Sequence, residues 1–155
     1  MTNIDDKLEQ ERLDDQFVEN LLNSNGSSLT SRRKILISMF YRYELGKHTY
    51  EYIQQDILDE NQFKIDESTS KVANDINDKW NEIVDEIESK LADKWHFDRI
   101  PALIRSILIV GVYEIKFTDT PKAVTINEMV SLTKTFEPDY NFKFVNGLLD
   151  KVNKI

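Results

Sequence analysis

The chain of 155 residues contains no cysteine, and it has only four glycines and three prolines. Without cysteine, neither a disulfide framework nor a thiolate metal site can form. Glycine and proline are the residues that most often interrupt helices, so their scarcity favours a helical protein. The length suits one domain with its own hydrophobic core.

The sequence also lacks a long uninterrupted apolar run. The longest apolar stretch extends from Ile100 to Val112 and is interrupted by Arg105. A bilayer-spanning helix needs about 20 apolar residues, so this stretch predicts a buried central helix instead. The first residues are acidic and include no basic-then-apolar leader. We therefore expect a cytoplasmic protein with no signal peptide and no membrane partner.

Motifs for catalysis or cofactor binding are scarce as well. His48 and His96 are far apart, and neither belongs to a ligand pair one helical turn apart. The sequence has no glycine-rich phosphate loop and no Gly-x-Ser-x-Gly elbow. Trp80 and Trp95 are interpreted as core or half-buried anchors. The sequence thus predicts a protein that is not an enzyme and that needs no cofactor or metal.

Charge is present in abundance but unevenly. The net charge is −8 overall, with −5 in residues 1–28, +4 in residues 29–48, −8 in residues 49–100 and +1 in residues 101–155. Local patches, not the total, decide what a surface attracts. One basic segment within an acidic protein therefore keeps nucleic acid among the candidate ligands.

Apolar residues recur at helical spacing through most of the chain, and no segment alternates with period two. Helices are expected from Thr30 or Ser31 to Gly46, over 49–58, 68–92 and 101–117, from Thr125 or Asn127 to Phe136, and over 140–154. This pattern predicts an all-α fold of two small antiparallel helical bundles packed into one domain. Gly111, inside the central helix, predicts a tight helix crossing.

The domain organisation follows from composition. Residues 1–30 are expected to form an acidic, flexible extension, because their apolar stripe is thin and a polar Ser/Asn/Gly stretch follows it. A marginal helix along the thin stripe is the alternative. Residues 31–155 are expected to form the all-α domain. The acidic extension directly precedes the basic segment, so we hypothesise that it competes with RNA for the basic residues.

Two groups of residues are candidates for binding RNA. The first is the cation cluster Arg32, Arg33 and Lys34, expected in the first turn of its helix. Such a cluster is consistent with a phosphate-binding site, although a run of this kind is more often a solvated helix end. Arg42 and Lys47 add to its charge.

The second group is Lys143, Phe144 and Asn146, near the start of the last expected helix. A cation, an aromatic ring and an amide suit phosphate, base stacking and a base edge respectively. The helical period also places Phe144 on the apolar face, so core packing is the alternative for this residue. Gly147 costs about 1 kcal/mol relative to alanine inside a helix, which predicts close approach by a neighbouring helix or a ligand.

At this point the sequence resembles the NusB family of transcription antitermination factors, from about Ser31 to Val152. The matching segments are Arg33 with Phe40-Tyr41, Asp98-Arg99-Ile100-Pro101, Val112-Tyr113-Glu114, Pro121-Lys122-Ala123-Val124-Thr125-Ile126-Asn127-Glu128, Leu132-x-Lys134-x-Phe136 and the block from Lys143 to Lys151. The Phe-Val-Asn-Gly block after an Ile-Asn-Glu block is a specific signal.

The resemblance implies a NusB-like all-α fold and a non-enzymatic function. It implies binding of boxA-type RNA together with ribosomal protein NusE, which helps RNA polymerase read through terminators in ribosomal RNA operons. The elongation complex is then an indirect partner. By this resemblance Arg32, Arg33, Lys34, Lys143, Phe144 and Asn146 are RNA-binding residues. Tyr41 matches a family aromatic that contacts RNA or a partner, with core packing as its alternative.

A different class of function stays open on sequence grounds. The chain could be a helical protein-interaction module that uses its acidic surface and has little affinity for RNA. Steep weakening of RNA binding by salt would favour the antitermination factor, because phosphate contacts release counterions. Binding of NusE without any dependence on RNA would favour the interaction module.

Overall fold

The computed structural model describes residues 28–46, 67–93 and 95–154, and within these ranges it contains helices and no strand. The prediction of an all-α fold is confirmed. The predicted helix over 49–58 and the extension up to residue 27 lie outside the described residues. Residues 28–30, assigned to the extension, belong to the first described helix instead.

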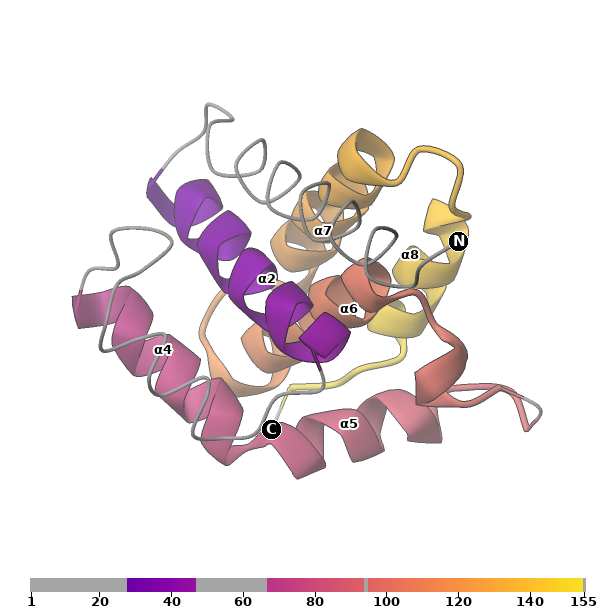
Figure 1. Cartoon of the computed structure of the whole chain (residues 1–155), viewed down its shortest axis with the longest axis horizontal. Helices are drawn as coiled ribbons and strands as arrows, with labels where there is room; N and C mark the ends of the chain where they lie inside the picture. Colours follow the sequence, from indigo (N-terminus) through magenta and orange to yellow (C-terminus); the bar gives the residue numbers. More distant parts are fainter. Residues whose placement is uncertain (1–27, 47–66, 94, 155) are drawn as a thin grey trace, which may run out of the picture.

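The described helices pack around one central helix (Figure 1). They are α2 (Ser28–Gly46), α4 (Glu67–Asp78), α5 (Trp80–Ser89), α6 (Ala102–Phe117), α7 (Lys122–Phe136) and α8 (Phe142–Asp150), with the 3-10 turn η1 (Phe97–Arg99) before α6. Helix α6 contacts α2 and α5 on one side and α7 and α8 on the other. It thereby joins two groups of helices into one domain.

The central position of α6 follows from its composition. Twelve of its residues, from Leu103 to Ile115, are buried, as expected of a helix that is apolar nearly all round. Pro101 directly precedes its first turn, where a missing N–H costs no helical hydrogen bond. At its other end, Lys154 donates from Nζ to the carbonyl oxygens of Ile115, Thr118 and Thr120, at 3.1, 2.8 and 2.7 Å. The C-terminal segment thus satisfies carbonyls that the helix end leaves unpaired.

Several predicted helix boundaries are wrong. The single helix predicted over 68–92 is two helices, because the chain bends at Lys79, between α4 and α5. Directly after the bend, the Trp80 ring packs against Phe40 and Tyr43 of α2, with ring centroids 5.7 and 5.0 Å apart. Helix α7 starts at Lys122, directly after Pro121, and α8 covers only 142–150 of the predicted 140–154.

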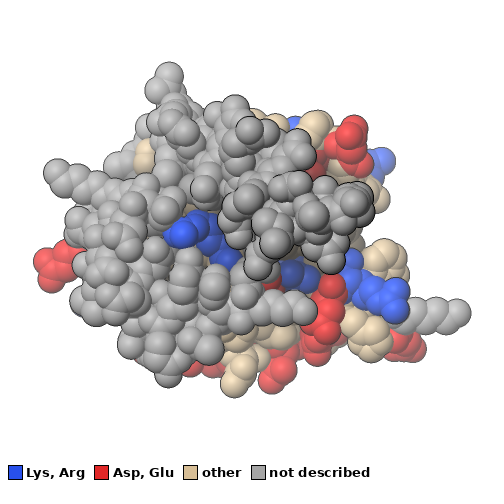
Figure 2. Space-filling model, viewed as in Figure 1, with Lys and Arg blue, Asp and Glu red and all other residues tan. Residues whose placement is uncertain are grey.

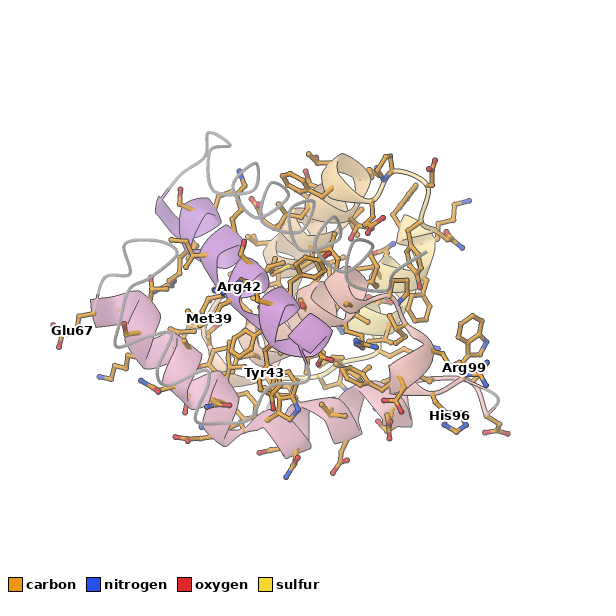
Figure 3. All side chains as sticks on the ribbon, viewed as in Figure 1. Met39, Arg42, Tyr43, Glu67, His96 and Arg99 are labelled. Atoms are coloured by element: carbon orange, nitrogen blue, oxygen red, sulfur yellow. The ribbon has the colours of Figure 1, made fainter. Side chains whose placement is uncertain are left out.

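The side chains of the first helix show how this packing divides its surface. Met39 is fully buried, and Tyr43 is packed partly against the core. Figure 3 places both on α2, and it places His96 and Arg99 at the far end, after α5. Acidic side chains lie along the lower edge of the molecule near α5 (Figure 2), and the sequence of α4 is also rich in acidic residues. That edge repels phosphate, so an RNA site is expected elsewhere.

Gly111 of α6 and Gly147 of α8 have different surroundings. A Cβ at Gly111 would lie 3.1 and 3.2 Å from the Leu149 methyl carbons and 3.3 Å from Met129 Cγ. The predicted tight crossing is therefore confirmed, between α6 and the pair α7 and α8. A Cβ at Gly147 would meet no described atom within 4 Å, and this residue is exposed. The prediction that a neighbouring helix approaches Gly147 closely is wrong.

This difference gives a matched pair of stability predictions. We expect Gly147→Ala to raise the free energy of unfolding by about 0.5–1 kcal/mol, since alanine is the better helix former and the space is open. Gly111→Ala should fail to give this gain, because its methyl group must displace Leu149 and Met129. Urea denaturation followed by circular dichroism measures both. Equal gains from the two variants would contradict the packing at Gly111.

Candidate nucleic-acid interface

Arg33 lies inside the protein, in a network of hydrogen bonds that joins three helices. Its side chain is 3% exposed. Arg33 Nε donates to Glu114 Oε2 at 2.9 Å and Nη2 donates to Oε1 at 2.5 Å. Thr125 Oγ1 donates to the same Oε1 at 2.9 Å, and Glu128 Oε1 lies 4.0 Å from Arg33 Nη1. The network thus connects α2 with α6 and α7.

This burial changes the role assigned to Arg33. Hydrogen bonding to the Glu114 carboxylate raises the pKa of the Arg33 guanidinium, so the side chain remains a cation paired within the core. A guanidinium held in this way has no face toward solvent for a phosphate. Arg33 therefore has a structural role, in which it holds α2 against α6, and its direct contact with RNA stays a prediction.

The two neighbours of Arg33 differ from it and from each other. Lys34 is 6% exposed, so it too is buried. Arg32 is partly exposed, and its Nη1 donates to Ser68 Oγ of α4 at 2.8 Å. Because α2 begins at Ser28, the three cations lie beyond its first turn, and the predicted start at Thr30 or Ser31 is wrong. Of the cluster, Arg32 is the residue best placed for a ligand.

The other predicted group lies on α8. Asn141 caps this helix by accepting a hydrogen bond from the backbone N–H of Lys143 at 3.1 Å. Lys143 and Asn146 are exposed, whereas Phe144 is half-buried and packs against the core. Phe144 therefore packs against the core, as one interpretation predicted, and keeps accessible surface, while its contact with RNA stays a prediction.

Phe144 is also the middle of a row of three aromatic rings. Its centroid lies 6.4 Å from that of Trp95 and 6.1 Å from that of Tyr140. Trp95 is 54% exposed, so its interpretation as a core or half-buried anchor is wrong, while Trp80 is partly buried as expected. Periodicity missed Trp95 because it follows α5 and belongs to no helical face. A cluster of rings with one exposed and two half-buried members suits stacking with unpaired bases.

The two predicted groups do not form one compact site. Helix α2, with Arg32 and the half-buried Tyr41, packs on α6 and α4, whereas α8 packs on α7 and α6 (Figure 1). Tyr41 packs against the core, which supports its packing alternative and leaves part of its ring exposed.

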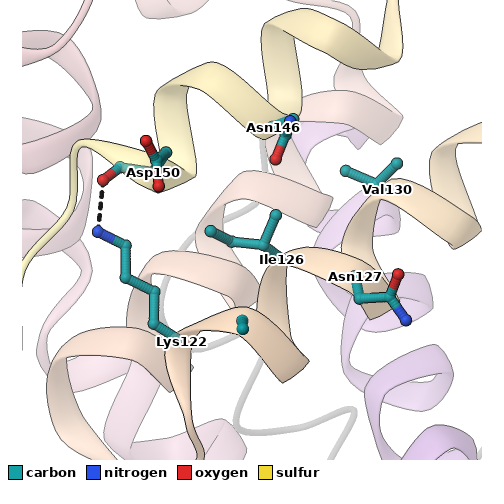
Figure 4. Close-up of a pocket in the computed structure, with 7 residues that line it drawn as sticks. Lys122, Ile126, Asn127, Val130, Asn146 and Asp150 are labelled. Atoms are coloured by element: carbon teal, nitrogen blue, oxygen red, sulfur yellow. Dashed lines mark hydrogen bonds between the residues drawn. The ribbon is translucent and has the colours of Figure 1, made fainter.

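A groove of about 580 Å³ lies between α7 and α8 (Figure 4). Its apolar lining comes from Ala123, Ile126 and Val130. Its polar lining comes from Lys122 and Asn127 of α7 and Asn146 and Asp150 of α8. Lys122 Nζ donates a hydrogen bond to the backbone oxygen of Asp150 and so joins the two helices at one end.

Of the residues that line this groove, the sequence predicted only Asn146 as a binding residue. The available signal was the pairing of exposed polar residues on two consecutive helices joined by a short turn, which brings them face to face. Elsewhere in the described chain, no group of three or more His, Cys, Asp or Glu side chains is arranged to hold a metal ion. No described helix combines the length and apolar character needed to cross a membrane.

Comparisons with known proteins agree with this geometry. The model of the NusB family matches residues 30–154. The transcription antitermination protein NusB of Campylobacter fetus subsp. fetus (strain 82-40) is 34% identical over 125 residues, which are 79% of this chain and 94% of that protein. The protein of the same name from Campylobacter jejuni (strain RM1221) is 36% identical over 124 residues, with 79% and 92% covered.

A solved structure, that of T. maritima NusB, superposes on the fold with a TM-score of 0.66 at 27% identity. The match covers 83% of this chain and 92% of that chain. Sequence and structure therefore lead to the same relatives over nearly the whole described fold. The chain belongs to the NusB family.

Proposed function

We propose that this protein is a cytoplasmic, non-enzymatic transcription antitermination factor that binds boxA-type RNA together with ribosomal protein NusE. Bound in this way, it helps RNA polymerase read through terminators in ribosomal RNA operons. The family match over residues 30–154 carries the proposal. The α8 surface supports it, because Lys143 and the row Trp95–Phe144–Tyr140 offer a cation and accessible rings side by side.

The candidate RNA-binding residues differ in how much of their surface is accessible to a ligand. Lys143, Phe144 and Asn146 all have accessible surface on α8, and Arg32 has it on α2. Arg33 acts indirectly, by holding α2 in place through Glu114. Lys34 is buried and is not proposed as a direct contact.

Salt dependence tests the proposal. Affinity for a fluorescently labelled boxA-type RNA, measured by anisotropy with and without NusE, should fall steeply with salt, by a slope of about 0.7 per neutralised phosphate. Lys143→Ala should lower this slope by about 0.7, because one phosphate contact is lost. Lys71→Ala, which removes an exposed lysine from the acidic α4, is the matched control and should leave the slope unchanged.

The alternative, a protein-interaction module with an acidic surface, rests on the acidic edge of α4 and α5 (Figure 2). It predicts that NusE binds with the same affinity whether or not RNA is present. It also predicts no saturable binding of boxA-type RNA at low salt. A steep decline of RNA affinity with salt therefore supports the antitermination factor, and the absence of saturable RNA binding supports the interaction module.

A further inference from the structure

Two asparagine side chains from different helices line the groove between α7 and α8, and the fold makes no evident use of them. Asn127 and Asn146 are both exposed, and each lies in a helix interior, where asparagine is a poorer helix former than alanine. Their neighbours in sequence behave differently: Thr125 bonds to the buried Glu114, and Val145 is fully buried. A ligand would explain the two asparagines where packing does not.

The chemistry of the groove restricts what that ligand can be. Three apolar side chains line it, and two carboxamides supply donors and acceptors at its edge. Asp150 is the one carboxylate among the lining residues, so a metal ion lacks ligands there. Lys122 is bound to the Asp150 carbonyl oxygen, so the groove offers no spare cation to hold a small anion. A flat, uncharged ring with polar edges fits these features, and a nucleobase is such a ring.

Lysines outside the groove extend the argument to a nucleic acid. Lys143 precedes Asn146 by about one turn of α8, and Lys134 follows Asn127 by about two turns of α7, so each lysine shares the helix face of its asparagine. Both lysines are exposed, and Lys134 Nζ lies 4.3 Å from the centroid of the Phe142 ring on α8. Two cations therefore stand beyond one end of the groove, where the phosphates next to a bound base would lie.

We propose that the α7–α8 groove is a base-reading subsite, which takes one unstacked nucleobase of a single-stranded RNA. The carboxamides of Asn127 and Asn146 hydrogen-bond to the edge of the base, and one face of the base lies against Ile126 and Val130. Lys134 and Lys143 hold the adjoining phosphates. This inference rests on the proposed function and adds to it a source of sequence preference, since amides can distinguish base edges whereas contacts with phosphates carry no sequence information.

The test compares Asn127→Ala and Asn146→Ala with the unchanged protein on a boxA-type RNA and on a scrambled RNA of equal length. Each variant should bind the boxA-type RNA about tenfold more weakly, the loss expected from removing a well-placed hydrogen bond. Binding of the scrambled RNA and the salt slope should not change, because no charge is removed. Asn81→Ala, an exposed asparagine on α5, is the control and should alter neither affinity.

A set of RNAs that each lack one base then locates the contact. At one position, loss of the base should weaken binding to the unchanged protein and remove the difference between it and the Asn146→Ala variant. Unchanged affinity of both asparagine variants for the boxA-type RNA would overturn this inference and leave the proposed function standing. Loss of NusE binding in place of RNA binding would also overturn it, since the groove would then hold a protein side chain. Absence of RNA binding by the unchanged protein would overturn both.

Discussion

Arg33→Ala should lower the free energy of unfolding by about 3–5 kcal/mol, because it leaves the Glu114 carboxylate buried without its cation. Small domains are stable by only about 5–15 kcal/mol, so this loss is a large fraction of the total. Urea denaturation followed by circular dichroism measures it. Arg32→Ala is the adjacent control: its hydrogen bond to Ser68 is exposed, so the change should stay within about 0.5 kcal/mol.

A double variant separates the ion pair from simple packing. Arg33→Met combined with Glu114→Leu removes both charges and keeps apolar volume, so it should cost less than the sum of the single changes. Thr125 would then lose its acceptor on Glu114, which leaves a small residual cost. If Arg33→Ala lowered the free energy of unfolding no more than Arg32→Ala does, the network would not hold α2 in place. Arg33 would then again be a candidate for direct contact with RNA.

This network also changes how RNA-binding variants should be interpreted. A joint change of Arg32 and Arg33 would weaken RNA binding even if neither touched RNA, because α2 would loosen from α6. Affinity of an Arg33 variant is therefore informative only beside its stability. Arg32→Ala and Lys143→Ala avoid this difficulty, since both side chains have accessible surface.

The sequence predicted those features that depend on local pattern. The buried helix over 101–117 followed from its apolar character, and the tight crossing at Gly111 followed from a glycine at its centre. It could not predict that Arg33 is buried, because the Glu114 partner is 81 residues away. In the sequence, a run of three cations has the same pattern whether its side chains face solvent or pair with a carboxylate far along the chain.

The same limit explains the errors around the site. Continuous periodicity over 68–92 predicted one helix, but Trp80 packs on α2 and the chain bends at Lys79. The cost of Gly147 predicted close approach by a neighbouring helix or a ligand, and no described helix approaches it. The α7–α8 groove depends on how two helices are paired in space. Periodicity describes a face, and the partner of that face is set by tertiary packing.

Phe144→Ala should reduce affinity for boxA-type RNA by about 10- to 100-fold, since stacking of one base on an aromatic ring contributes about 1–3 kcal/mol. The ring also packs against the core, so some loss of stability should accompany it. Phe144→Leu is the matched control, because it keeps apolar packing and removes the flat ring. A stacking role predicts that both variants lose RNA affinity, and that the leucine variant keeps most of the stability.

Trp95 gives an independent check on this aromatic row. Its ring is 54% exposed and lies beside Phe144, so Trp95→Ala should weaken RNA binding about tenfold at little cost to stability. Binding of RNA should also change the fluorescence of Trp95, measured against a Trp95→Phe variant that retains Trp80. If Phe144→Leu bound RNA as well as the unchanged protein, and Trp95→Ala did the same, the row would be packing alone. RNA contact would then rest on Lys143, Asn146 and Arg32. Electrostatic contacts with phosphates, which the salt slope measures, would account for nearly all of the affinity.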